Sequence, residues 1–132
     1  MARVVTQVLD VDYCADAAPQ LPKEDHDGIR VDGLVDILAN KVVTLLDFPE
    51  PKHFVDLYAG LRSGAVDATA VLDHAARKRT IDAYHLARAL HQGKHVRLAG
   101  LDLCHPIDPG DLSAFFEELR NGVLDRLRPP GA

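Results

Sequence analysis

Proline and glycine breaks are the feature of this sequence that most constrains its fold. Between residues 33 and 127, apolar side chains recur three and four positions apart, and most of these runs end at a residue that stops a helix. Pro49 and Pro51 separate the first two runs, Ser63-Gly64 ends the second, and Gly93 ends the fourth. The pattern predicts five helices, over about residues 33–46, 51–62, 67–78, 81–92, and from 108 or 111 to 127. Asp32 and Thr80 are expected to cap the first and fourth helices, and Asp36 to lie on the polar side of the first.

The residues before the first helix have a different character. Residues 3–13, RVVTQVLDVDY, are rich in Val and Leu and alternate imperfectly, which favours a strand. Residues 15–28, ADAAPQLPKEDHDG, contain two prolines and a polar cluster and are expected to form a loop, followed by a short extended piece at 29–31. The prediction is an α+β, mostly helical protein, with a short N-terminal β element before about five packed helices.

The totals support one domain over residues 1–132, with its helical region at 29–127. Hydrophobic residues make up 47 % of the 132 residues, which is enough for a core. No apolar stretch approaches the length of a membrane span and no secretory segment follows Met1, so we expect a cytoplasmic protein without a membrane partner. The net charge of −5 argues against coating of nucleic acid but allows a local basic patch.

The two cysteines do not indicate a special chemistry. Cys14 and Cys104 lie far apart in the sequence without a Cys-x-x-Cys spacing, and we expect reduced structural thiols. His91 and His95 are four residues apart, but Gly93 between them is a poor helix interior, so we do not expect a zinc site.

Residues 38–57, LANKVVTLLDFPEPKHFVDL, contain two charged residues that need an explanation. On a helical wheel, Lys41 lies at the edge of the apolar arc, between Leu34 and Ile37. Its stem can pack on the core while the ammonium reaches water, or the ammonium can neutralise a phosphate as a point charge. Asp56 lies opposite the apolar stripe of its own helix, where it is either a solvated carboxylate or part of a site.

The run LVDILANKVVTLLDFPEPKHFVDLYAGL resembles the C-terminal signature of the AbiEii-type nucleotidyltransferases. These are bacterial enzymes of the polymerase-β superfamily, and many are toxins of toxin–antitoxin systems. The family's acidic-x-x-Ala-x-Lys-x-x-Ala-Leu helix corresponds to the helix that contains Lys41 here. The family's Pro-Arg-Asp-x-x-Asp-Leu motif appears here as Pro51-Lys-His-Phe-Val-Asp-Leu57. The segments ARKRTIDAYHLARAL and IDPGDLSAFFEELRNGVLDRL are also similar, so the resemblance covers about residues 25–127.

The resemblance implies roles for two residues. Lys41 would hold the triphosphate of a bound nucleotide, and Asp56 would support the active site. The Arg-Asp pair of the family motif is Lys52-His53 here, so one acidic position is lost. His53 lies one helical turn before Asp56 and can pair with it. Lys52 and His53 are expected to contact the phosphates together with Lys41.

The metal-binding part of the family pattern departs further. Nucleotidyl transfer in this superfamily needs a Gly-Ser turn and, about ten residues later, an Asp-x-Asp strand that binds two Mg²⁺ ions. Asp10 and Asp12 form an Asp-x-Asp on one strand face, but no Gly-Ser precedes them. They can equally be a strand end that enters a loop. The resemblance therefore implies a truncated or divergent nucleotidyltransferase, similar to the C-terminal part only, that uses Mg²⁺ if it is active and is not expected to be catalytic alone.

Several cations could form a second phosphate-contacting surface, or could simply be solvated. They are Arg77, Lys78, Arg79, Arg88, His91, Lys94, His95 and Arg97. The expected partners are a nucleotide or RNA, an antitoxin or other partner protein, and a second copy of the chain paired through the strand at 3–13. Two alternatives stay open: a non-enzymatic binding or regulatory module, and an enzyme completed by a partner subunit that transfers a nucleotide to RNA.

Overall fold

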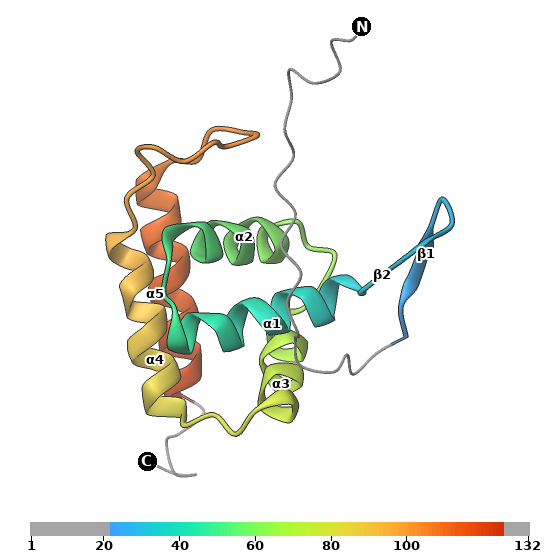
Figure 1. Ribbon diagram of the computed structural model, residues 1–132. Coiled ribbons are helices and arrows are strands. Elements are labelled where there is room, and N and C mark those ends of the chain that lie inside the picture. Colours follow the sequence, from blue (N-terminus) through green and yellow to red (C-terminus); the bar gives the residue numbers. More distant parts are fainter. Residues whose placement is uncertain (1–21, 126–132) are drawn as a thin grey trace, which may run out of the picture.

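A computed structural model describes residues 22–125 and places a small hairpin before five α-helices (Figure 1). The elements are β1 (Glu24–His26), β2 (Ile29–Val31), α1 (Leu34–Asp47), α2 (Pro51–Arg62), α3 (Ala68–Lys78), α4 (Ala83–His91), the 3-10 helix η2 (Gln92–His95) and α5 (Pro109–Asp125). The predicted α+β, mostly helical class is confirmed. Each predicted helix is present, with its ends within about two residues of the prediction, a usual spread for helix boundaries.

The hairpin corrects the prediction for residues 15–28. Residues 24–26 were expected to lie in a loop, but they pair antiparallel with β2, with Glu24 opposite Val31. The turn between the strands is Asp27-Gly28, and both residues have positive φ, 53° and 81°. A two-residue turn of this kind needs both residues in the left-handed region, which is why Asp-Gly favours it. The predicted strand at 3–13 lies outside the described residues.

Helix α1 is central and packs against α2, α3 and α4 (Figure 1). α2 returns antiparallel to α1 after the Pro49-Glu-Pro51 break, and Gly60 permits the close approach. A Cβ at Gly60 would lie 2.6 Å from Leu38 Cδ2. A side chain at this position would require the end of the Leu38 side chain to move.

Packing on several sides of α1 changes which of its residues are buried. Asp36 was expected on the polar side of this helix, yet it is fully buried. Ile37 was expected on the apolar side, yet it is 39 % exposed. A single apolar stripe describes a helix with one buried face, whereas α1 is covered from more than one direction.

Aromatic side chains join α2 to α5. The Phe54 and Phe116 rings meet edge to face with 5.2 Å between their centroids, and Tyr58 and Phe115 meet at 5.1 Å. Such T-shaped pairs are the preferred arrangement of aromatic quadrupoles. η2 also packs on α5, where a Cβ at Gly93 would lie 2.3 Å from Phe116 Cγ.

Two helix starts differ from the prediction. Asp32 was expected to cap the first helix, but Gly33 occupies that position and Asp32 accepts a hydrogen bond from Lys23 at 2.8 Å. Thr80 was expected to cap the fourth helix, but Asp82 caps it and accepts from the backbone N–H of Tyr84. In both cases a neighbouring residue has the extended backbone that an N-cap requires.

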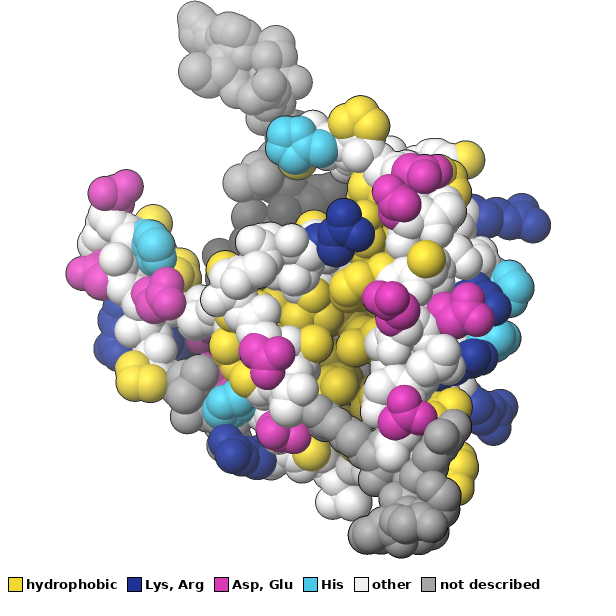
Figure 2. Space-filling view, turned by 180° about the vertical axis from the view of Figure 1, so that it is seen from behind, with side chains coloured by type: hydrophobic (Ala, Val, Ile, Leu, Met, Phe, Trp, Pro, Cys, Tyr) yellow, Lys and Arg dark blue, Asp and Glu magenta, His cyan; other side chains and the backbone are white. Residues whose placement is uncertain are grey.

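The face opposite to that of Figure 1 is hollowed. Figure 2 shows hydrophobic side chains at the bottom of the hollow and acidic side chains along its sides. Two cavities lie between α3 and α5, and both are lined by Leu72 and Val123.

Within the described part of the chain, no helix is both long and apolar enough to cross a membrane.

Candidate functional site

Lys41 and Asp56 form an ion pair across the seam between α1 and α2. Lys41 Nζ lies 2.9 Å from Asp56 Oδ2, and the two side chains are 28 % and 51 % exposed. The antiparallel course of the helices creates this contact, because it places the middle of α1 beside the middle of α2. The two residues that the sequence singled out are therefore brought together by the fold.

His53 lies in the same neighbourhood on α2. Its Nδ1 is buried and has no hydrogen-bond partner within residues 22–125. Burial lowers the pKa of His53 below its ordinary value, and the positive charge of Lys41 lowers it further. The predicted pairing of His53 with Asp56 is absent from the ion pairs of the described residues. Asp56 contacts Lys41 instead. The neutral imidazole is thus the favoured form beside the Lys41 ammonium.

Two substitutions are expected to move the pKa of His53 in opposite directions. Lys41→Met should raise it, because the protonated ring would no longer face a positive charge. Asp56→Asn should lower it, because the nearby carboxylate favours the protonated ring. Titration of the His53 ring protons by NMR measures both shifts, and Lys23→Met serves as a distant control. A change of the same sign in both variants would contradict this electrostatic arrangement.

Lys52, another predicted phosphate ligand, lies at the start of α2. Its side chain is well exposed and its ammonium lies 3.5 Å from a carboxylate oxygen of Glu50. An exposed pair of this kind is weak and easily exchanged. Lys52 is therefore free to turn toward an anion bound near Lys41.

The basic run at the end of α3 does not form one surface. Arg77 is exposed, but the side chain of Lys78 is completely buried with its Nζ 3.2 Å from Asp36 Oδ1. Arg79 instead reaches α1, where Nη1 donates to Asp47 Oδ2 at 2.7 Å. Successive residues of a helix point about 100° apart, so three neighbouring cations must face different surroundings. Lys78 was predicted as a phosphate ligand or a solvated cation, and its burial removes it from the candidate site.

The cations of α4 and η2 are also separated by their partners. Lys94 Nζ lies 3.6 Å from Glu117 Oε1, and His91 Nδ1 accepts a hydrogen bond from Arg120 Nη1 at 2.7 Å. Arg88, His95 and Arg97 are exposed. Sequence reasoning missed Arg120, although its place four residues after the core residue Phe116 indicated a position near the buried face of α5.

Most of the chain matches one known protein family. The family described as "Nucleotidyl transferase AbiEii toxin, Type IV TA system" matches residues 6–129, which is most of the chain. The chain belongs to this AbiEii nucleotidyl transferase toxin family. No curated protein and no solved structure matches it significantly. The predicted resemblance is confirmed, and membership in a toxin–antitoxin family suggests an antitoxin partner.

The metal ligands predicted for this AbiEii family member are two aspartates near the start of the sequence. Asp10 and Asp12, the predicted Mg²⁺ ligands, lie within the family match but outside residues 22–125. Among the described residues, no group of three or more His, Cys, Asp or Glu side chains is arranged to hold a metal.

Cys104 is a free, exposed thiol rather than a buried structural one.

Proposed function

We propose that this AbiEii family member is a nucleotidyltransferase-like protein that binds the phosphates of a nucleotide or of RNA at Lys41. The observation that carries the proposal is the Lys41–Asp56 ion pair at 2.9 Å, with both side chains reaching solvent. A lysine ammonium has three N–H donors, and Asp56 can accept only from those that point toward it. The remaining donors are available to a phosphate oxygen.

The neighbours of Lys41 have separate roles in this proposal. Asp56 holds the long lysine side chain in one orientation, which reduces the conformational entropy lost when the ligand binds. Burial and the Lys41 charge lower the pKa of His53, which favours its neutral ring beside Lys41. Lys52 at the rim can supply a second cation to an extended phosphate chain.

Catalysis is the finer part of the proposal. If the chain transfers nucleotides, Asp10 and Asp12 are the candidate Mg²⁺ ligands, and the metal would supply charge neutralisation at the reacting phosphate. The 132 residues contain no Gly-Ser dipeptide, the turn that cradles phosphate in this superfamily. We therefore propose that the chain alone transfers nucleotides far more slowly than a relative that has this turn.

Binding of nucleoside triphosphates tests the role of Lys41. Titration calorimetry with each of the four ribonucleoside triphosphates and Mg²⁺ should show at least about tenfold weaker binding for Lys41→Met, because a charge-assisted contact to phosphate is lost. Lys23→Met is a matched control, since Lys23 also pairs with an aspartate, Asp32, at 2.8 Å but lies beside the hairpin. Equal affinities for the wild type and Lys41→Met would overturn the assignment of Lys41.

A labelling assay separates the alternatives. Radiolabelled nucleotide is incubated with RNA and Mg²⁺, with and without a candidate antitoxin. Robust labelling that is abolished in Asp12→Ala would show a complete enzyme, and labelling only with an added protein would show one completed by a partner subunit. Absence of both labelling and nucleotide binding would favour a non-enzymatic binding or regulatory module.

A further inference from the structure

The pocket between α4 and α5 contains a cation without an acidic partner. Arg120 is only partly exposed, and within residues 22–125 it forms no ion pair with a carboxylate. By contrast, ion pairs hold Lys23, Lys41, Lys78 and Arg79. A partly buried charge without a counter-charge has lost hydration without full compensation. This arrangement favours the arrival of an anion from outside the chain.

Two neutral groups hold the Arg120 guanidinium in place. Nη1 donates to His91 Nδ1 at 2.7 Å, and Nη2 donates to Asn121 Oδ1 at 3.2 Å. An arginine can donate to Nδ1 only if that nitrogen carries no proton, so the His91 ring is neutral in this arrangement. His91 and Asn121 thus orient the guanidinium but do not neutralise its positive charge.

The space beside this guanidinium suits a small molecule. The cavity has a volume of about 380 Å³ and is lined by Tyr84, Ala87, Arg88, His91, Gln92, Arg120 and Leu124. Its volume falls within the range of small-molecule sites. Within the described residues, its lining includes two arginines and no carboxylate, in a protein whose net charge is −5.

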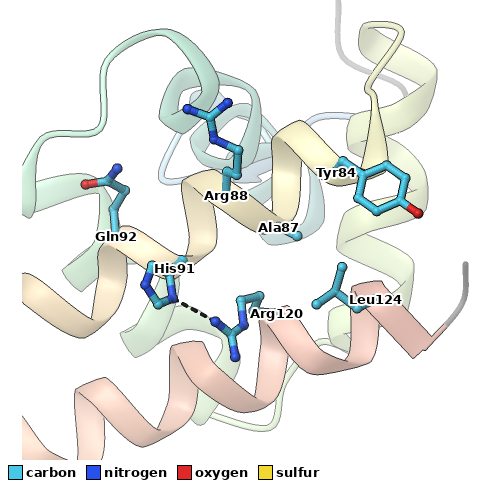
Figure 3. Close-up of a pocket in the computed structure, with 7 residues that line it drawn as sticks. All are labelled: Tyr84, Ala87, Arg88, His91, Gln92, Arg120 and Leu124. Atoms are coloured by element: carbon cyan, nitrogen blue, oxygen red, sulfur yellow. Dashed lines mark hydrogen bonds between the residues drawn. The ribbon is translucent and has the colours of Figure 1, made fainter.

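The polar and apolar parts of the pocket are at different ends. Figure 3 shows Arg120 directed from α5 toward His91 on α4, while Leu124 lies one turn further along α5 below Tyr84. Ala87 lies between these ends on α4 (Figure 3). The exposed Tyr84 ring and the Leu124 side chain offer a surface for a flat apolar group.

We propose that the α4–α5 pocket binds a small planar ring that carries an oxyanion, either a phosphate monoester or a carboxylate. The oxyanion accepts hydrogen bonds from Arg120, whereas the Arg88 side chain points away from α5 (Figure 3). The ring lies along Ala87 and Leu124 toward Tyr84. This site uses helices other than α1 and α2, so it stands independently of the role proposed for Lys41.

Phenyl phosphate is the first probe, added to the ¹⁵N-labelled full chain and followed by NMR. We expect the amide signals of Ala87, His91, Arg120 and Leu124 to shift together along one binding curve. Inorganic phosphate should bind more weakly because it lacks the ring, and benzyl alcohol more weakly still because it lacks the charge. Benzoate separates the two anion sources: tighter binding than phenyl phosphate would identify a carboxylate, and weaker binding a phosphate monoester.

Substitutions test which residues hold the anion and the ring. Arg120→Met should weaken phenyl phosphate binding at least about tenfold, the loss expected for a hydrogen bond to a charged group. Arg62→Met is the control, because Arg62 lies over the Tyr58 ring on α2 and outside this pocket. Tyr84 is 66 % exposed, so Tyr84→Ala should leave the fold intact and weaken phenyl phosphate but not inorganic phosphate.

Three results would overturn the proposal. The first is the absence of phenyl phosphate shifts in the folded wild-type chain. The second is a set of shifts confined to α1 and α2. The third is equal affinity of phenyl phosphate for the wild type and Tyr84→Ala, which decides the matter even if Arg120→Met fails to fold.

Discussion

Replacing Lys78 with alanine is expected to lower the free energy of unfolding by about 3–5 kcal/mol, the range for breaking a buried ion pair from one side. The Lys78 and Asp36 side chains are both fully buried, with Nζ 3.2 Å from Oδ1. The contact has the distance of an ion pair, but the ammonium lacks the geometry of a hydrogen bond. Removing the lysine would take a positive charge away from the buried Asp36 carboxylate. Because a domain of this size is stabilised by about 5–15 kcal/mol in total, the loss should be visible as a large fall in the denaturation midpoint.

Urea denaturation followed by circular dichroism measures this effect, and two further variants sharpen it. Lys23→Ala removes a lysine from an exposed ion pair and should cost no more than about 1 kcal/mol. The double variant Asp36→Leu/Lys78→Met should be close to the wild type in stability, because it removes both charges and fills the space with apolar groups. A loss for Lys78→Ala no greater than that for Lys23→Ala would contradict the buried pair.

Truncation of Phe116 is expected to be as damaging as loss of Lys78. Phe116 is fully buried on α5, and its ring meets those of Phe54 and Phe115 at centroid distances of 5.2 and 5.1 Å. Phe116→Ala should cost about 3–5 kcal/mol, because it removes buried apolar area and leaves a cavity among three elements. Phe48→Ala is the control, since Phe48 is 64 % exposed and should change stability by less than about 0.5 kcal/mol.

A double-mutant cycle with Gly93 tests whether the packing of η2 against the Phe116 ring accounts for the loss of stability. A Cβ at Gly93 would meet the Phe116 ring at 2.3 Å, so Gly93→Ala should destabilise the wild-type chain. In the Phe116→Ala background the same change should cost less, because the ring atoms are absent and only the Cβ of residue 116, at 2.7 Å, remains close. Additive effects of the two substitutions would show that η2 and α5 do not pack as described.

The sequence by itself determined the helical part of the fold and the family. Local rules decide where a short helix starts and stops, because proline and glycine act on the backbone at their own position. Pro51 therefore opened α2 where it was expected. The family signature around Lys41 is also local, and the match over residues 6–129 confirmed it. The extended piece at 29–31 was also predicted, and the Asp27-Gly28 turn was equally readable. Strand β1 was missed because three residues carry little alternation.

Only the tertiary structure decided which charges are partners. Lys41 and Asp56 meet because α1 and α2 pack antiparallel, and the spacing of fifteen residues alone does not require it. Lys78 looked like its neighbours Arg77 and Arg79, but α3 turns it inward toward Asp36. Arg120 and His91 are twenty-nine residues apart and meet only because α4 and α5 lie side by side. Burial and pairing depend on what each helix packs against, and a helical pattern reports the face that a residue occupies but not the neighbour that covers it.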